Sequence, residues 1–390
     1  MPSIKITPDP NSDTYKSPIE QAGWFSHLNF LWILPFMKKV NKKRNDCTIH
    51  DIPDLGKSEL PSKFRDRILA EYNFQKKATK KKPSMFKIIE KCFRSTLGAS
   101  LLAQVIYCLC RIAYGVLLNQ VLRSLSDENE TAKDAFMWAI GLILCIIISV
   151  YARNHKAHHA ERAATMIKTG LISLIYQKAC SLSSQTLHKM NVGKIVNLVA
   201  HDVNLLDAGL SGVISLASAP IAIIGSLILL WIFFGPSCLV GFGFIVLSAP
   251  LQALATKKSK TWRADKNNAS DERVKLTNEV IDEIRLLKMY AWELEYMKMV
   301  QNVRAREVGY LKKMMTLDFG NRAFSLSIQG ISAFLIFLTF YLPGGNLTSS
   351  IVFPTVFMLK FVRFYGIYVI LLGHAMLIEI NLVFNSSHTA

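Results

Sequence analysis

The chain has 390 residues, of which 51% are hydrophobic and 19% are charged, and its formal net charge is +18. This composition excludes an ordinary soluble domain, because so much apolar surface could not be covered by the remaining polar residues. Stretches of about twenty apolar residues, long enough to cross a hydrocarbon core of about 30 Å, alternate with blocks rich in Lys and Arg. The pattern indicates a polytopic α-helical membrane protein.

The positive charge raises the question of a nucleic-acid partner, because clustered Lys and Arg bind phosphates. Here the charge lies in segments that flank the apolar stretches, where the positive-inside rule places it. We therefore expect no nucleic-acid partner, and instead a basic cytosolic surface beside the lipid bilayer. The seven cysteines are scattered without metal or disulfide spacing, so we expect no cofactor and no metal in this chain.

Three segments precede the membrane spans. Residues 1–18 form a polar tail that lacks the charged-then-apolar start of a cleaved signal peptide. Residues 19–38 are rich in aromatic side chains but are interrupted by polar residues and by Pro35, which favours an interfacial elbow helix over a span. Residues 39–84 follow as a basic cytosolic linker.

Six apolar spans follow within 85–383. They are predicted at 97–122, 135–152, 210–234, 236–255, 323–342 and 350–372. The second and third spans and the fourth and fifth spans are separated by long, basic, helix-patterned segments, whereas the other three loops are short and carry almost no Lys or Arg. This asymmetry predicts that both termini and both long segments face the cytosol.

Two N-glycosylation sequons agree with this orientation. Asn129 and Asn346 each begin an Asn-x-Thr motif in a loop that the charge asymmetry places outside. Sequons at Asn268 and Asn385 lie on the predicted cytosolic side and should stay unmodified. The sequence therefore predicts a glycoprotein with two accessible acceptors.

Long helices are expected because proline, the strongest breaker of a helix interior, is missing from long stretches. No proline occurs between Pro83 and Pro220 or between Pro250 and Pro343. If 135–181 is one helix, it extends about 70 Å. We therefore expect helices that continue well beyond the membrane on the cytosolic side.

Three motifs carry a family resemblance. The stretch 278–293 reads NEVIDEIRLLKMYAWE, 193–203 reads GKIVNLVAHDV, and 29–39 reads NFLWILPFMKK. Together they resemble the first transmembrane domain of a short-type multidrug resistance-associated protein of ABC transporter subfamily C. The first motif is the most specific, while Ile33-Leu34-Pro35 departs from the usual Asn-Pro-Leu of the elbow.

The resemblance implies an all-α, six-span exporter-type transmembrane domain with long cytosolic helical extensions, in the plasma membrane. It implies that a second transmembrane domain and two nucleotide-binding domains complete the transporter, with ATP and Mg in the latter. The second cytosolic loop would be a coupling helix that docks on a nucleotide-binding domain, through Leu287, Lys288, Met289, Tyr290, Ala291, Trp292 and Glu293. By the same comparison, residues 384–390 are an atypical C-terminal tail.

No nucleotide-binding motif is recognised in the chain itself. The fragment Gly56-Lys57-Ser58 follows Asp51 where a Walker A loop needs glycine, and Leu210-Ser211-Gly212 continues with Val213 inside a span rather than as a signature motif. No catalytic residue is therefore predicted. Other members of the resembling family are a chloride channel or regulators of potassium channels, so a channel-related subunit and an inactive truncated product remain alternatives.

Cationic residues inside two spans suggest a substrate site. Arg111 lies in the first span, and Lys360 and Arg363 lie three residues apart on one face of the sixth. A cation at membrane depth needs a watery cavity or a partner. One interpretation is that these cations snorkel or pair with carboxylates of another domain. The alternative is a functional site, in which the cations attract amphipathic organic anions. The predicted site is Arg111, Lys360 and Arg363 with the aromatic residues Phe361, Phe364 and Tyr365.

His155, His158 and His159 could in principle ligate a metal, since positions four apart share a helix face. No carboxylate or Cys completes the set, so we expect a solvated basic helix face. Asp202, Asp207, Asp282 and Glu283 are expected in surface ion pairs of the helical extensions.

Overall fold

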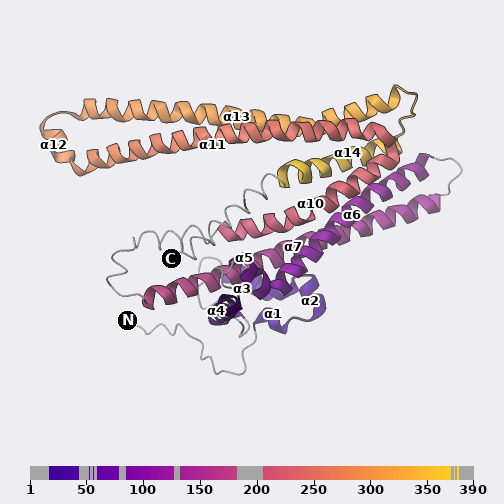
Figure 1. Cartoon of the computed structure of the whole chain (residues 1–390), viewed down its shortest axis with the longest axis horizontal. Helices are drawn as coiled ribbons and strands as arrows, with labels where there is room; N and C mark the ends of the chain where they lie inside the picture. Colours follow the sequence, from indigo (N-terminus) through magenta and orange to yellow (C-terminus); the bar gives the residue numbers. More distant parts are fainter. Residues whose placement is uncertain are drawn as a thin grey trace. The chain divides into compact units, whose positions relative to one another are not determined.

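The computed structural model describes residues 17–43, 52, 56, 59–78, 85–126, 132–181, 205–369, 373 and 376. All regular elements in these ranges are helices, as predicted (Figure 1). The chain divides into two compact units, one made of 1–111, 144–218 and 372–390 and the other of 112–143 and 219–371. Each unit is described by itself below. The polar tail before Ser17, the loop sequon at Asn129, the motif at 193–203 and the C-terminal tail lie outside the described residues.

Four helical stretches in the described ranges are long and apolar enough to cross a membrane. They are Arg94–Ser126, Lys133–Ser181, Gly209–Asp282 and Glu293–Tyr341. The third contains two of the predicted spans, because α10 (Leu205–Phe234) passes through the short 3-10 turn η6 (Gly235–Ser237) into α11 (Cys238–Asp282). The chain is thus an integral, multi-pass membrane protein.

The expected continuity of the second span with its extension is confirmed. Helix α7 runs unbroken over Ala132–Ser181, 50 residues or about 75 Å. Pro220 and Pro250 lie inside α10 and α11 without ending either helix. The last predicted span is shorter as an α-helix than expected, since α14 covers Ser349–Arg363 and gives way to a π-helical turn at Phe364–Val369.

The elbow of the first unit is not one helix. It consists of α1 (Pro18–Gln21), α2 (Trp24–Leu28), the 3-10 turn η1 (Leu31–Ile33) and α3 (Leu34–Lys43). The break falls at Phe30, whose backbone is left-handed with φ of 54° and so cannot continue a helix. Trp24 and Phe25 are 78% and 61% exposed, which fits a segment lying in the membrane interface.

The histidines of α7 hold this elbow. Phe30 stacks on His155 with ring centroids 4.9 Å apart and meets His158 edge-on at 5.4 Å. Tyr151 also donates a hydrogen bond to the Asn29 side-chain oxygen at 2.6 Å. Burial, with the neighbouring His159 and Arg162, lowers the pKa of His158 to about 4. The expected solvated basic face is therefore wrong here, since the rings are half-buried against aromatic groups; no metal-binding cluster occurs among the described residues.

The predicted linker contains a packed helix. α4 (Pro61–Ala78) and α5 (Met85–Cys92) join α7 around a core in which Phe64, Ile68 and Ile88 are fully or nearly fully buried. Arg162 of α7 adds a salt bridge of 2.7 Å to Glu59 just before α4. The core of the first unit thus lies on the extension of α7.

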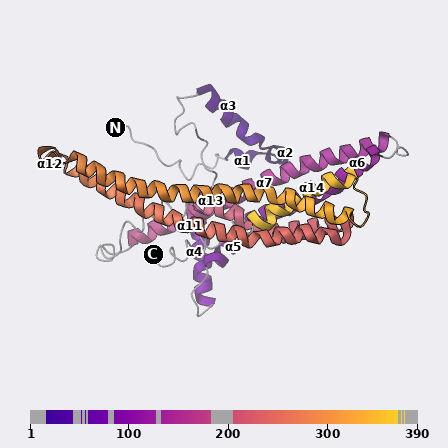
Figure 2. The same ribbon diagram turned by 90° about the horizontal axis from the view of Figure 1, so that it is seen from above.

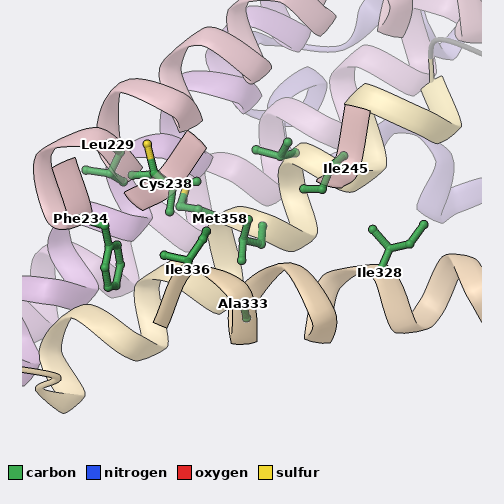
Figure 3. Packing of buried hydrophobic residues seen from close by; sticks show 11 residues of the cluster. Leu229, Phe234, Cys238, Ile245, Ile328, Ala333, Ile336 and Met358 are labelled. Atoms are coloured by element: carbon green, nitrogen blue, oxygen red, sulfur yellow. The ribbon is translucent and has the colours of Figure 1, made fainter. Parts of the chain in front are cut away.

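The second unit is organised by a long hairpin. α11 and α13 (Glu293–Tyr341) lie side by side, with the short α12 (Ile284–Met289) at their far end (Figures 1 and 2). At the other end the two helices, α14 and the second half of α10 enclose a buried cluster (Figure 3). The cluster comprises Leu229, Leu230, Phe234, Cys238, Ile245, Ile328, Ala333, Ile336, Met358, Leu359 and Val362.

Close approach of α11 to α13 depends on one small residue. A Cβ atom at Gly241 would lie 2.5 Å from Cγ1 of Ile336 and 2.8 Å from the backbone oxygen of Ser332. Small residues permit such contacts between helices in membranes, where packing rather than the hydrophobic effect drives association. The membrane half of the hairpin is therefore held by close packing.

Candidate coupling segment and cationic helix

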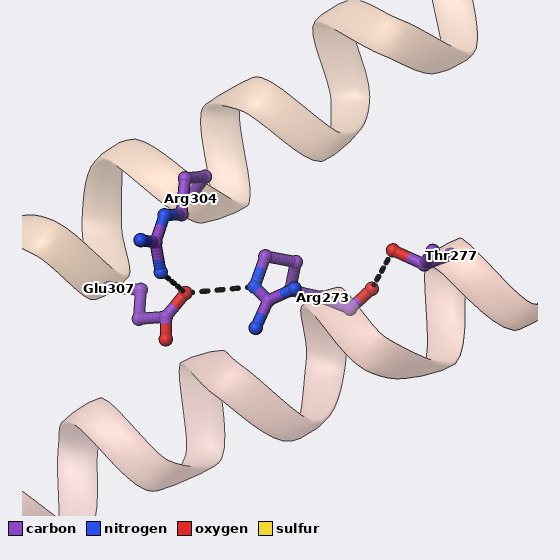
Figure 4. A network of polar contacts seen from close by, with 4 residues as sticks. All are labelled: Arg273, Thr277, Arg304 and Glu307. Atoms are coloured by element: carbon purple, nitrogen blue, oxygen red, sulfur yellow. Dashed lines mark hydrogen bonds and ion pairs between the residues drawn. The ribbon is translucent and has the colours of Figure 1, made fainter.

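Charged residues stabilise the part of the hairpin beyond the buried cluster. Glu307 of α13 is 5% exposed and accepts from Arg273 of α11 at 2.9 Å and from Arg304 at 2.8 Å (Figure 4). A second, exposed pair joins Arg306 to Glu272 at 2.7 Å. These contacts join α11 to α13 beyond the spans predicted from the sequence.

Hydrogen bonds from Arg304 and Arg273 lower the pKa of Glu307. Their effect outweighs that of burial, which alone would raise this pKa. A carboxyl whose pKa is depressed on folding stabilises the folded state above its ordinary pKa of about 4.3 and loses that contribution as pH falls through the depressed value. The ion pair is therefore fully formed at neutral pH.

Glu307→Gln should loosen the middle of the hairpin, because both arginines lose a charged acceptor. Backbone amides around Arg273 should exchange with deuterium faster than in the parent at pH 7, and the difference should shrink at acid pH. The control is Glu272→Gln, which removes an exposed pair and should have a smaller effect. Equal effects of the two substitutions would contradict the role of Glu307.

The far end of the hairpin is closed by a specific turn. α12 ends at Met289, and the amide of Trp292 donates to the carbonyl of Leu287 at 3.0 Å while that of Ala291 donates to Lys288 at 3.4 Å. These two bonds form a Schellman motif, which needs a left-handed residue after the helix. Ala291 fills this position with φ of 54°, which is less favourable for Ala than for Gly.

The turn buries one side chain and exposes the others. Leu287 is 4% exposed, whereas Met289, Tyr290 and Trp292 are 74%, 60% and 54% exposed. The Tyr290 and Trp292 rings stack with centroids 5.2 Å apart. The remaining predicted coupling residues, Lys288, Ala291 and Glu293, are also exposed.

The apolar surface continues around the turn. Ile281, Ile284, Leu286 and Leu294 are between 42% and 68% exposed. Apolar side chains gathered on a solvated tip are typical of a protein-binding surface. We call this surface the hairpin tip; its members are Ile281, Ile284, Leu286, Met289, Tyr290, Trp292 and Leu294.

Most of the predicted substrate residues lie on or next to α14. Lys360 is exposed, while Arg363 is half-buried and donates from Nη1 to the Ser325 carbonyl at 3.0 Å, with the Ser325 hydroxyl 3.4 Å away. The partner of Arg363 is thus a neutral group of α13, which sequence reasoning did not identify. Arg111 belongs to the other unit, where its guanidinium lies 5.8 Å from the Tyr107 ring centroid.

The predicted aromatic residues differ in burial. Phe361 and Tyr365 are 5% and 2% exposed and pack edge-on at 4.8 Å, so they belong to the helix packing. Phe364 is 46% exposed, and its ring meets that of Tyr365 edge-on at 5.3 Å. Of the α14 set, Lys360 and Phe364 therefore present the most surface.

Comparisons with known proteins agree with this architecture. The family model described as "ABC transporter transmembrane region" matches residues 97–384. ATP-binding cassette sub-family C member 4 of mouse is 26% identical over 349 residues, and the human protein of the same name is 27% identical over 358 residues. These matches cover 88% and 89% of this chain but only 26% and 27% of the relatives, so the chain spans about a quarter of their length. The resemblance to subfamily C is thereby confirmed, and the chain belongs to the family of ABC transporter transmembrane regions.

Proposed function

We propose that this chain supplies the membrane domain of an ATP-driven exporter and couples to a nucleotide-binding domain through the hairpin tip. The observation that carries the proposal is the Schellman turn that exposes Tyr290 and Trp292 at the end of two long, ion-paired helices. Partly exposed aromatic groups on a rigid support are effective interface anchors. A stiff hairpin can transmit a movement at its tip to the membrane half.

The complete transporter would contain two nucleotide-binding domains, which bind ATP and Mg, and a second transmembrane domain. Binding and hydrolysis of ATP would then drive alternating access to the translocation pathway. The residues of this chain contribute the pathway and the mechanical link, and the nucleotide chemistry belongs to the other domains. We infer that the assembly works in the plasma membrane.

We infer six spans rather than the four long stretches alone. Support comes from the turn at Gly235, which divides the third stretch in two, and from α14, which corresponds to the last span predicted from the sequence. An even number of spans agrees with cytosolic placement of both termini. The hairpin tip then lies in the cytosol.

Glycan mapping tests this orientation. Asn346 is exposed in the loop between α13 and α14, whereas Asn268 lies in α11 on the part of the hairpin that we propose to be cytosolic. After synthesis of the chain in the presence of microsomes, Asn346 should be modified and Asn268 should stay bare, with Asn346→Gln as the control that removes one glycan's mass shift and leaves that of Asn129. Modification at Asn268 would reverse the orientation.

The proposed substrate is an amphipathic organic anion. Support comes from Lys360, exposed at α14, and from Arg363, which donates to neutral oxygens of Ser325, so its positive charge is not cancelled by these contacts. Phe364 offers adjacent apolar surface. A net positive lining favours anions over neutral compounds of similar shape.

The test compares two amphipathic compounds, one anionic and one neutral, taken up into inside-out vesicles by a polypeptide that joins this domain to nucleotide-binding domains. Arg363→Ala should reduce uptake of the anion about fivefold or more, because it removes one charge from a region of low polarity. Uptake of the neutral compound should change little. Arg322→Ala, which removes an exposed cation of α13, is the control; equal loss of both compounds would refute the site.

A further inference from the structure

A groove on the hairpin lies outside the tip and outside α14. It is formed by one face of α11 and α13, has a volume of about 630 Å³ and is lined mainly by apolar side chains. Leu251 and Phe324 line the end that falls within the predicted spans, and Trp262, Lys312 and Lys313 line the other end. The groove therefore crosses the predicted cytosolic boundary of the membrane.

The two ends differ in chemistry. Leu251, Leu317 and Phe324 offer a surface for hydrocarbon, while Lys312 and Lys313 are exposed on α13 at the polar end. On α11, Lys258 places its ammonium 5.5 Å from the centroid of the Trp262 ring. Trp is typical of the level at which lipid headgroups begin.

The charge at the polar end is not balanced by nearby carboxylates. Lys257, Lys258 and Lys260 of α11 precede Trp262, and Lys312 and Lys313 face the same groove from α13. Among the described residues, Asp318 of α13 forms an ion pair of 3.8 Å with Arg263 of α11 in this region. Cations therefore outnumber carboxylates on this stretch of the two helices, which favours an anionic ligand.

We propose that this groove binds an anionic phospholipid of the cytosolic leaflet, with its headgroup phosphates at Lys312 and Lys313 and one acyl chain along Leu251, Leu317 and Phe324. Basic pockets at the cytosolic ends of membrane helices suit phosphorylated headgroups, and each Lys near the surface contributes to such binding. The apolar lining that continues from the lysines toward Leu251 and Phe324 can hold an acyl chain, which a free phosphate compound does not have. The inference rests on the proposed orientation, which glycan mapping tests separately.

The groove contains a position for a blocking substitution. Gly320 lines it, and a Cβ atom built there meets no atom within 4 Å. A leucine at 320 can therefore start into open space, and we expect it to fill part of the groove. Gly309 lies on the same helix outside the groove and has equally free space, so Gly309→Leu is a matched control.

The experiment uses the full 390-residue chain, purified in detergent and analysed by native mass spectrometry with three probes. The probes are dioctanoyl phosphatidylinositol bisphosphate, dioctanoyl phosphatidylcholine and free inositol trisphosphate. We expect the first to bind in preference to the other two. Gly320→Leu should abolish this preference, and Gly309→Leu should retain it.

The cations are tested in the same way. The double variant Lys312→Gln, Lys313→Gln should bind the anionic lipid roughly twenty-five-fold more weakly, from about fivefold for each lysine. The variant Lys275→Gln, Lys298→Gln removes the same charge from the far half of the hairpin and should bind as the parent does. Equal weakening by both pairs would show attraction by net charge alone and would overturn the proposal.

Two further results would also overturn it. Binding of inositol trisphosphate as tightly as the lipid would mean a phosphate site without an acyl chain. A shift from dimer to monomer caused by Gly320→Leu in analytical ultracentrifugation, without a change in lipid binding, would mean that protein covers the groove.

Discussion

Replacing Trp292 by Ala should reduce ATP-dependent transport by about tenfold or more while leaving substrate affinity nearly unchanged. The indole is 54% exposed and is supported by Tyr290 and by the turn beneath it, as expected of an anchor that dominates an interface. It lies at the far end of the hairpin from the α14 residues of the proposed substrate site. The measurement is uptake into inside-out vesicles together with binding of the same compound.

The control for this variant is Ala291→Gly, which keeps the left-handed conformation that the turn requires and removes no aromatic group. It should transport as the parent does. Loss of substrate binding with retained ATP-dependent coupling in Trp292→Ala would show that the hairpin tip has another role.

Gly241→Ala should destabilise the membrane half of the hairpin by about 1–3 kcal/mol, the usual cost of overpacking. The new methyl group would overlap Ile336 and the backbone of Ser332, and backbone cannot move aside as a flexible side chain can. α11 and α13 would have to separate next to the buried cluster. Thermal unfolding of the purified chain in detergent measures the effect.

Gly243→Ala is the matched control, because it lies in the same helix and its Cβ would meet no atom within 4 Å. Its stability should equal or slightly exceed that of the parent, since Ala favours a helix over Gly. If both variants unfold alike, the close contact at Gly241 does not determine the packing.

The sequence was sufficient to predict the features that depend on composition and on the positions of proline, which breaks helices. Long apolar segments and the rarity of proline predicted continuous helices, and α7 is continuous over Ala132–Ser181 as expected. The YAWE stretch predicted the location of the turn between α11 and α13. These features are local, so they need no knowledge of which segments pack together.

Features that depend on tertiary contacts could not be predicted in this way. Left-handed backbone at Phe30 and Ala291 has no glycine to indicate it, because surrounding contacts impose it. Arg363 donates to Ser325, which lies 38 residues earlier on another helix. Glu307 is buried between two arginines, and one of them, Arg273, belongs to a different helix. For Arg363 the sequence suggested a carboxylate partner, snorkelling or an anionic substrate, and it did not single out Glu307.

Helix α4 was detectable in principle. Phe64, Ile68 and Tyr72 recur every four residues, which is the spacing of one helix face. The high content of Lys in the same stretch favoured the interpretation as a basic linker. The structure places Phe64 and Ile68 in the core of the first unit.

Cross-linking from the hairpin tip tests the central claim most directly. A photo-reactive amino acid is placed at position 292 in a polypeptide that joins this domain to nucleotide-binding domains, and at Asn346 in the loop between α13 and α14 as the control. We expect the probe at 292 to link to a nucleotide-binding domain, with a yield that changes when ATP is added, and the probe at 346 to give no such product. Products from position 292 that contain only lipid or membrane-domain peptides, in a protein that still transports, would contradict the account.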